Sequence, residues 1–156
     1  MTRYRILTTF LLLLVASMNF AAEDKKITTD ELPSHARFFL RTEFPKSKIL
    51  SVIMIEDNDV QYRVNTHDNS KFFFDDEGMW VNLECPEIGV PSFVIPQKIQ
   101  TAVRKNCGPK TKVVQLKKIS RGRYDVELSN GFGLRFDKKM EIIDVRDKSL
   151  MTQVQH

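Results

Sequence analysis

Apolar residues recur at helical spacing in two separate stretches of the chain. The first stripe consists of Leu32, Ala36, Phe39, Leu40 and Phe44, and the second of Ile95, Ile99, Ala102, Val103 and Cys107. This three-and-four spacing predicts two amphipathic helices, the first over about residues 30–42. Asp30 and Ser92 are the expected helix caps, and a proline-containing turn follows each stripe.

Four short segments of alternating polar and apolar residues follow each predicted helix. The first four lie at about residues 48–56, 60–66, 71–75 and 79–83, and the second four at about 112–119, 123–128, 132–137 and 141–146. Turn-forming residues separate these segments, and Asn130-Gly131 is the strongest hairpin signal among them. Each helix is therefore expected to precede an antiparallel meander of four strands.

This helix-plus-strands pattern is an internal repeat. Its landmarks recur 62 to 64 positions apart: Leu32-Pro33 and Ile95-Pro96, Pro45 to Ile49 and Pro109 to Val113, Tyr62 to Val64 and Tyr124 to Val126, Phe72 to Asp75 and Leu134 to Asp137. We assign the first repeat to residues 27–84, a linker to 85–91, the second repeat to 92–147 and a tail to 148–156.

The predicted fold class is α+β, with two tandem modules of one helix plus a four-stranded antiparallel meander. Separate modules of this size would leave strand edges exposed. We therefore expect the meanders to join in one eight-stranded sheet, with both helices on one face. The core face is expected to carry Tyr62, Val64, Phe72, Phe74 and their counterparts in the second module.

The first 22 residues are typical of a secretion signal. Arg3 and Arg5 precede a short apolar core, and small residues follow up to Ala22. The apolar run is shorter than the ~20 residues that span a bilayer, which favours a cleaved leader over an anchor. No cysteine lies near the expected cleavage site, so a lipid anchor is not predicted. The expected location is periplasmic or secreted, with no stable membrane insertion after signal removal.

The charge balance gives little support to a nucleic-acid partner. The chain has 24 Lys and Arg against 20 Asp and Glu, a net charge of +4. Removal of Arg3 and Arg5 with the leader leaves a net charge of +2, and the remaining charges of both signs are interspersed.

Two cysteines in an exported chain raise the question of a disulfide. Cys85 follows the last strand of the first module, and Cys107 ends the second helix. A Cys85–Cys107 bond and a role for Cys107 as a small buried hydrophobe are both open at this point. Two cysteines and three scattered histidines have no metal-ligand spacing, so neither a metal nor a cofactor is predicted.

The ordered motifs resemble the PepSY-like family, whose secreted members in Bacteroidetes-type bacteria are described as beta-lactamase-inhibitor-like. The matching residues are Leu32-Pro33, Phe44-Pro45 to Ile49, Tyr62 to Val64, Phe74-Asp75 and Gly78-Met79-Trp80, with a second copy at Ile95-Pro96, Tyr124 to Leu128, Ser129-Asn130-Gly131 and Phe136-Asp137. The resemblance implies tandem helix-plus-four-strand modules, an open sheet face for binding and no catalytic residues. Inhibition of a beta-lactamase is not predicted, because the family's description reflects likeness of fold.

The sheet face opposite the helices is the predicted binding site. If the strands alternate regularly, this face carries a patch made of Ile53, Ile55, Phe73, Trp80, Arg63, Asn65 and Asn82. Aromatic patches rimmed by polar groups are typical of binding surfaces, with Trp and Arg as anchors. The alternative is that Trp80 and Phe73 pack beneath the linker or the tail.

The sequence therefore favours a non-enzymatic binding module for a protein or peptide of the cell envelope. The alternatives are a structural or regulatory envelope protein that acts by sheet-edge pairing, and an inhibitor of a hydrolase. An enzyme is disfavoured because no carboxylate pair or triad recurs in a plausible site. The acidic turn at Asp75-Asp76-Glu77 is weak evidence for Ca²⁺, because the second copy reads Asp137-Lys138-Lys139.

Overall fold

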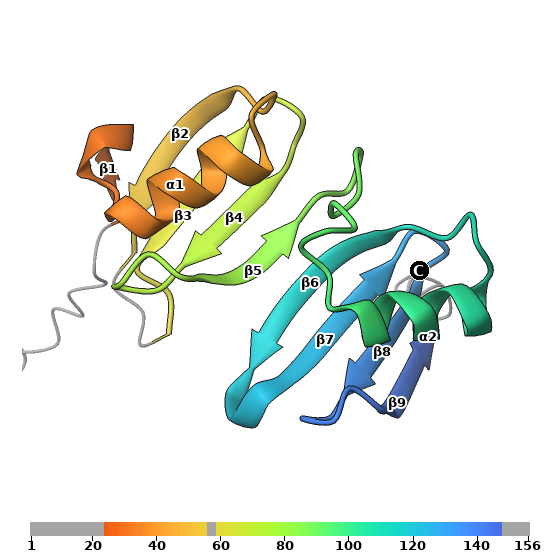
Figure 1. Cartoon of the computed structure of the whole chain (residues 1–156). Coiled ribbons are helices and arrows are strands. Elements are labelled where there is room, and N and C mark those ends of the chain that lie inside the picture. The colour runs from red at the N-terminus through yellow and green to blue at the C-terminus, as the bar shows by residue number, and fades with distance from the viewer. Residues whose placement is uncertain (1–23, 56–58, 148–156) are drawn as a thin grey trace, which may run out of the picture.

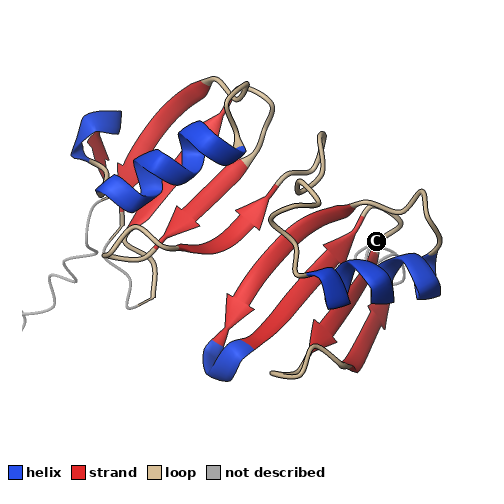
Figure 2. Cartoon of the chain, in the orientation of Figure 1, coloured by secondary structure: helices blue, strands red, loops and turns tan. Residues whose placement is uncertain are grey.

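The computed structural model describes residues 24–55 and 59–147, which form one open sheet with two helices on one face (Figures 1 and 2). The helices are α1 (Ser34–Glu43) and α2 (Gln97–Cys107), with short 3-10 turns at Thr29–Glu31 and Ser120–Gly122. The strands are β1 (Lys25–Ile27), β2 (Ile49–Met54), β3 (Tyr62–Thr66), β4 (Lys71–Phe74), β5 (Trp80–Glu84), β6 (Val113–Ile119), β7 (Arg123–Leu128), β8 (Phe132–Phe136) and β9 (Ile142–Asp147). The predicted leader at 1–22 and the predicted tail at 148–156 lie outside the described residues.

All nine strands run antiparallel in chain order, so the sheet is a continuous meander. The predicted α+β class, tandem modules and single-sided helices are confirmed. The predicted count of eight strands is wrong, because β1 pairs with β2 and adds a ninth. Three residues are too few to show an alternating pattern, and only Ile27 of β1 is buried.

Both helices begin one residue after a proline, later than their predicted caps. Pro33 precedes α1 and Pro96 precedes α2. Proline is favoured at a helix start because its ring presets the backbone angle and its missing N–H would have no partner there. In the first module the predicted cap lies instead inside the 3-10 turn, which Thr28 and Glu31 close by a capping box.

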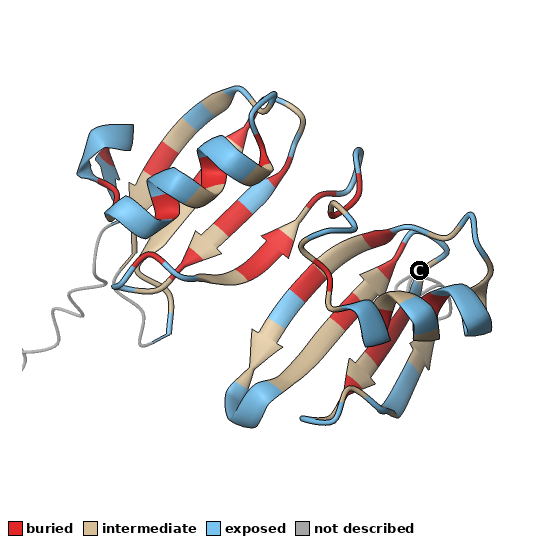
Figure 3. Cartoon of the chain, in the orientation of Figure 1, coloured by how far each residue is buried: buried red, intermediate tan, exposed pale blue. Residues whose placement is uncertain are grey.

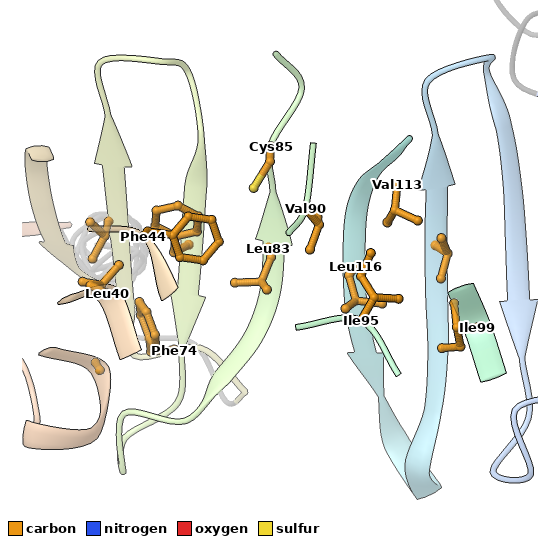
Figure 4. Close-up of a cluster of buried hydrophobic side chains, with 14 of the residues drawn as sticks. Leu40, Phe44, Phe74, Leu83, Cys85, Val90, Ile95, Ile99, Val113 and Leu116 are labelled. Atoms are coloured by element: carbon orange, nitrogen blue, oxygen red, sulfur yellow. The ribbon is translucent and has the colours of Figure 1, made fainter. Parts of the chain in front are cut away.

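One lateral row of apolar side chains crosses the whole sheet on the face that the helices cover. Each member pairs with the next across neighbouring strands, in the order Ile27, Val52, Val64, Phe72, Leu83, Leu116, Val126, Leu134 and Val145. The first eight members are buried, and helix residues including Leu40 and Ile99 pack in the same core (Figures 3 and 4). We call this series the core row.

The two modules join through strand pairing between β5 and β6. Leu83 pairs with Leu116 at the centre of this junction, and neither side chain is exposed. The core therefore continues from one module into the next without a break in the hydrogen-bonded sheet.

Gly78 allows the β4–β5 turn to approach the start of α1. Its φ is +81°, and a Cβ there would lie 2.7 Å from Pro33 Cβ and 2.9 Å from the backbone nitrogen of Ala36. In the second module Met140 occupies the equivalent turn position with a φ of +63°. The Gly-x-Trp motif of the first repeat thus reflects close packing of hairpin on helix.

We expect Gly78→Ala to lower the free energy of unfolding by about 3 kcal/mol, because the new methyl group adds a clash to left-handed backbone strain. Gly122→Ala is the matched control: its φ is +71°, but its Cβ would meet only Lys138 Cβ, at 3.8 Å. The control substitution should lower the free energy of unfolding by about 1 kcal/mol. Urea denaturation measures both, and equal losses would contradict the clash.

Candidate functional site

The open face of the sheet carries a second lateral row, which the β-strand pairing defines residue by residue. Its members, in order from β1 to β9, are Lys26, Ile53, Arg63, Phe73, Asn82, Lys117, Asp125, Arg135 and Asp144. We call this series the open row. Four of the seven predicted site residues are consecutive members of it, and they are Ile53, Arg63, Phe73 and Asn82.

Two further predicted residues lie beside these four. Asn65 is two positions after Arg63 on β3, and its side-chain amide donates to Ser51 Oγ (2.8 Å). Ile55 directly follows β2, and its N–H donates to the Gln61 carbonyl (2.7 Å). Arg63 itself contacts the Asp24 carboxylate at 3.4 Å. Six of the predicted residues are therefore grouped on the first module.

Trp80 does not belong to this group, and its predicted position on the open face is wrong. Phe74 pairs with Trp80 whereas Phe73 pairs with Asn82, so β5 contains a β-bulge with Val81 as the extra residue. The bulge turns Trp80 towards α1, where its ring stacks on Phe39 at a centroid distance of 6.5 Å. The tryptophan thus packs against a helix, which neither the open-face prediction nor the alternative of packing beneath the linker or the tail named.

Lys118 also lies over the tryptophan ring. Its Nζ lies 3.7 Å from the ring centroid and donates to the Trp80 carbonyl (3.0 Å). Burial lowers the pKa of Lys118, and the nearby Asp75 carboxylate partly opposes that shift. This cation–π contact links β5 of the first module to β6 of the second.

A signal for the bulge is present in the sequence. Trp80 and Leu83 are three residues apart, whereas regular alternation would place two core residues an even number apart. The second module repeats this spacing with Ile142 and Val145. There Phe136 pairs with Ile142 and Arg135 pairs with Asp144, so the same register shift separates β8 from β9. The spacing indicates a bulge only once Trp80 is known to face the core, and that fact came from the structure.

A hollow of about 1060 Å³ lies on the open face across the junction of the modules. Phe73, Val81 and Asn82 are among its lining residues. Every charged lining residue from the first module is acidic, and every one from the second module is basic. The acidic residues are Asp59, Asp75, Asp76 and Glu84, and the basic residues are Lys117, Lys118, Arg123 and Arg135. The hollow therefore has one acidic side and one basic side. Sequence reasoning missed this polarity because it depends on the β5–β6 register.

The open face of the second module is occupied by its own ion pairs. Asp125 accepts a two-point contact from Arg135 (2.8 and 3.0 Å) and a third from Arg146 (3.2 Å). The hydrogen bond from Arg135 lowers the pKa of Asp125 against the opposing effect of burial. These charges are mutually satisfied, which favours the first module and the junction as the binding region.

A smaller groove of about 600 Å³ lies beside α1 and was not predicted. Phe38, which is 60% exposed, and Phe44 are among its lining residues. The repeat-equivalent groove beside α2 measures about 150 Å³. Phe38 lies off the apolar helix stripe, so the sequence pattern did not single it out.

The acidic turn considered for Ca²⁺ has a structural explanation. Asp75 Oδ1 accepts from the backbone N–H groups of Glu77 (3.1 Å) and Met79 (2.8 Å). Asp137 Oδ1 accepts in the same way from Lys139 (2.8 Å) and Glu141 (2.9 Å). The recurrent Phe-Asp pair therefore closes a hairpin in each module.

Asp75→Ala and Asp137→Ala should each lower the free energy of unfolding by about 1–2 kcal/mol, because two backbone donors lose their acceptor. Asp76→Ala, at the exposed neighbouring position, should change it by about 0.5 kcal/mol or less. Chemical denaturation in calcium-free buffer tests this. A loss at Asp75 that appears only when Ca²⁺ is present would contradict the turn-closing role.

Both cysteines are free thiols in the structure. Cys85 is completely buried just after β5, whereas Cys107 at the end of α2 is half-buried. Burial raises the pKa of the Cys85 thiol to about 12, with a smaller opposing effect from a hydrogen bond to Ser70. Cys85 therefore acts as part of the core.

We expect Ellman's reagent at mildly alkaline pH to modify Cys107 in the folded protein and to leave Cys85 unmodified, because the buried thiol stays protonated and inaccessible. Both should react after unfolding in guanidinium without reductant. Cys107→Ser is the control and should abolish the native-state reaction. An unfolded protein in which neither thiol reacts would instead establish a Cys85–Cys107 disulfide.

Within residues 24–55 and 59–147, no group of three or more His, Cys, Asp or Glu side chains is placed to hold a metal ion. In the same part of the chain, neither helix is long and apolar enough to cross a membrane.

Comparison with family models gives two matches to one family. The model described as "putative beta-lactamase-inhibitor-like, PepSY-like" matches residues 18–78 and again residues 60–144. The paired matches agree with the tandem modules seen in the sheet. None of the curated proteins compared matches the chain.

Solved structures from Bacteroides species have the same fold. A "putative periplasmic protein from DUF2874 family" of Bacteroides vulgatus is 32% identical, with a TM-score of 0.74 over 81% of this chain and 98% of that one. A "putative calcium-regulated periplasmic protein" of Bacteroides thetaiotaomicron is 33% identical, with a TM-score of 0.73 over 79% and 96%. A further Bacteroides vulgatus protein, "of unknown function", is 26% identical, with a TM-score of 0.73 over 80% and 100%.

Proposed function

The chain belongs to the PepSY-like, beta-lactamase-inhibitor-like family, and from that premise we propose that it is a non-enzymatic binding module of the periplasm. Its ligand is a segment of an envelope protein or peptide, held on the open face of the sheet. The periplasmic location is supported by the leader-like sequence at residues 1–22 and by the description of its relatives.

The observation that carries this proposal is the hollow across the β5–β6 junction. Phe73 and Val81 give it apolar surface, and both side chains are half-buried. An apolar patch of this kind, bordered by polar groups, is typical of a protein-binding surface. Phe73 replaces Trp80 as the expected anchor, because Trp80 already packs against α1.

The charges around the hollow define the polarity of the ligand. Asp75 and Asp76 favour a basic group over the first module, and Lys117 and Arg123 favour an acidic group over the second. The best-fitting segment therefore places an apolar side chain over Phe73 between a basic and an acidic residue. In the open row Phe73 lies between Arg63, which contacts Asp24, and the buried Asn82, whose amide donates to Glu84 Oε1 (2.9 Å).

If the bound segment is a loop of a hydrolase with this charge pattern, the protein would act as an inhibitor of that hydrolase through the same binding surface. Nothing in the described residues favours a particular hydrolase. The calcium regulation named for the Bacteroides thetaiotaomicron protein is not included in the proposal, because the acidic turn of this chain is engaged in closing a hairpin.

The test is affinity capture from an envelope extract of the source organism, with the purified exported chain as bait. Phe73→Ala should lose the captured partner, and binding measured by calorimetry should weaken about tenfold or more through loss of the anchor. Phe38→Ala is the matched control, because it removes an exposed phenylalanine from the groove beside α1. It should bind like the parent.

A second variant tests the polarity of the hollow. Lys117→Glu should weaken binding and reduce its salt dependence, because the ligand's acidic group then meets a like charge. Loss of the partner with Phe38→Ala, or equal binding by Phe73→Ala and the parent, would refute binding on the open face. Circular dichroism should confirm that each variant is folded.

A further inference from the structure

The core row is buried from β1 to β8 and then ends on an exposed residue. Val145 on β9 is 59% exposed, whereas Leu134, its neighbour in the row, is 2% exposed. Ile143 on the same strand is 53% exposed. An edge strand with exposed apolar side chains is a template for pairing with another strand.

The internal repeat indicates which kind of strand pairs with such an edge. β5 is the last strand of the first module, as β9 is of the second, and both strands contain the same bulge. Leu83 pairs with Phe72 in the first module, and Val145 pairs with Leu134 at the equivalent position of the second. In the first module the outer edge of this strand pairs antiparallel with β6, and Leu83 is completely buried. Among the described strands, none pairs with the equivalent edge of β9.

We propose that β9 pairs antiparallel with β9 of a second copy of this chain, so that two nine-stranded sheets become one. A twofold axis at Val145 would place the two valines side by side and complete the core row on both copies. The same surface then serves both partners, as in the closed twofold dimers that are the commonest protein assemblies.

The charges of β9 select this register. With Val145 opposite Val145 of the second copy, Asp144 of each chain lies opposite Arg146 of the other. Two opposite-charge pairs across the axis would then add to the Arg146–Asp144 contact that exists within each chain (3.5 Å). A shift that centres the axis on Asp144 would oppose two aspartates, and one centred on Arg146 would oppose two arginines. Both alternatives are disfavoured by like-charge repulsion.

The other sheet edge is a poorer partner for β9. β1 is three residues long and contains Lys25 and Lys26, and edge lysines are a common protection against strand pairing. Pairing of β9 with β1 of the next molecule would also produce an open filament, because that contact does not close on itself. The self-complementary β9 edge instead gives a closed dimer.

The experiment is sedimentation velocity on the exported chain, from low micromolar to near-millimolar concentration. The parent should form a dimer as concentration rises, and Val145→Lys should weaken dimerisation about tenfold or more, because two lysines would face each other at the axis. Leu50→Lys is the matched control, since Leu50 on β2 is also 59% exposed. It should dimerise like the parent.

A mixing experiment tests the register itself. Asp144→Lys and Arg146→Glu should each be monomeric alone, because each opposes like charges across the axis. The two variants should dimerise when they are mixed. On one side of the axis, the lysine introduced into one variant then faces the glutamate introduced into the other. On the opposite side, the native Asp144–Arg146 pair forms. Thermal melts should show that both are folded, because Arg146 also contacts Asp125.

A parent that stays monomeric throughout would overturn the proposal, as would dimers or filaments that persist in Val145→Lys. Two folded charge variants that fail to dimerise on mixing would overturn the proposed register. A monomer that becomes dimeric only when residues 148–156 are removed would show that the tail occupies the β9 edge, which also overturns the proposal for the intact chain. Loss of the dimer leaves Phe73 and the hollow unchanged, so this result is separable from partner binding on the open face.

Discussion

The structure depends on the continuity of the core row across the strands. Each of its members is apolar, and the helices cover it along both modules, so burial of this row is the main source of hydrophobic stabilisation. A one-residue slip between any two strands would move apolar side chains to the open face and charged ones to the core. The register of the whole sheet, and with it the position of every open-face residue, follows from this constraint.

The open row shows how one fold supports two different surfaces. In the first module its members include Ile53 and Phe73, and the equivalent positions of the second are Lys117 and Arg135. Because the core row fixes only one face, substitutions on the other can change its chemistry at little cost to folding. The open face of the first module can therefore offer apolar contacts, whereas on the open face of the second module the charged side chains form ion pairs with one another around Asp125.

The junction between the modules combines structural and binding roles. β5 pairs with β6, Lys118 lies over Trp80, and the hollow, which Lys118 also lines, crosses the same two strands. Backbone pairing of β5 with β6 fixes which residues of the acidic and basic sides adjoin, and such preorganisation reduces the ordering cost of binding a ligand of matching polarity. The bulge in β5 serves both sides, since it turns Trp80 into the core and leaves Val81 beside Phe73.

The sequence by itself determined the repeat, the two helices, eight of the strands and the identity of the buried face, because these depend on local periodicity that survives in each copy. It also placed Ile53, Arg63, Phe73 and Asn82 on the correct face, since each of them directly adjoins a core-row residue with no bulge between the two. Only the tertiary structure decided the position of Trp80, because a bulge of one residue reverses the alternation. The β5–β6 register, the polarity of the hollow and the added strand β1 also came only from the tertiary structure, because each depends on pairing between residues far apart in the chain.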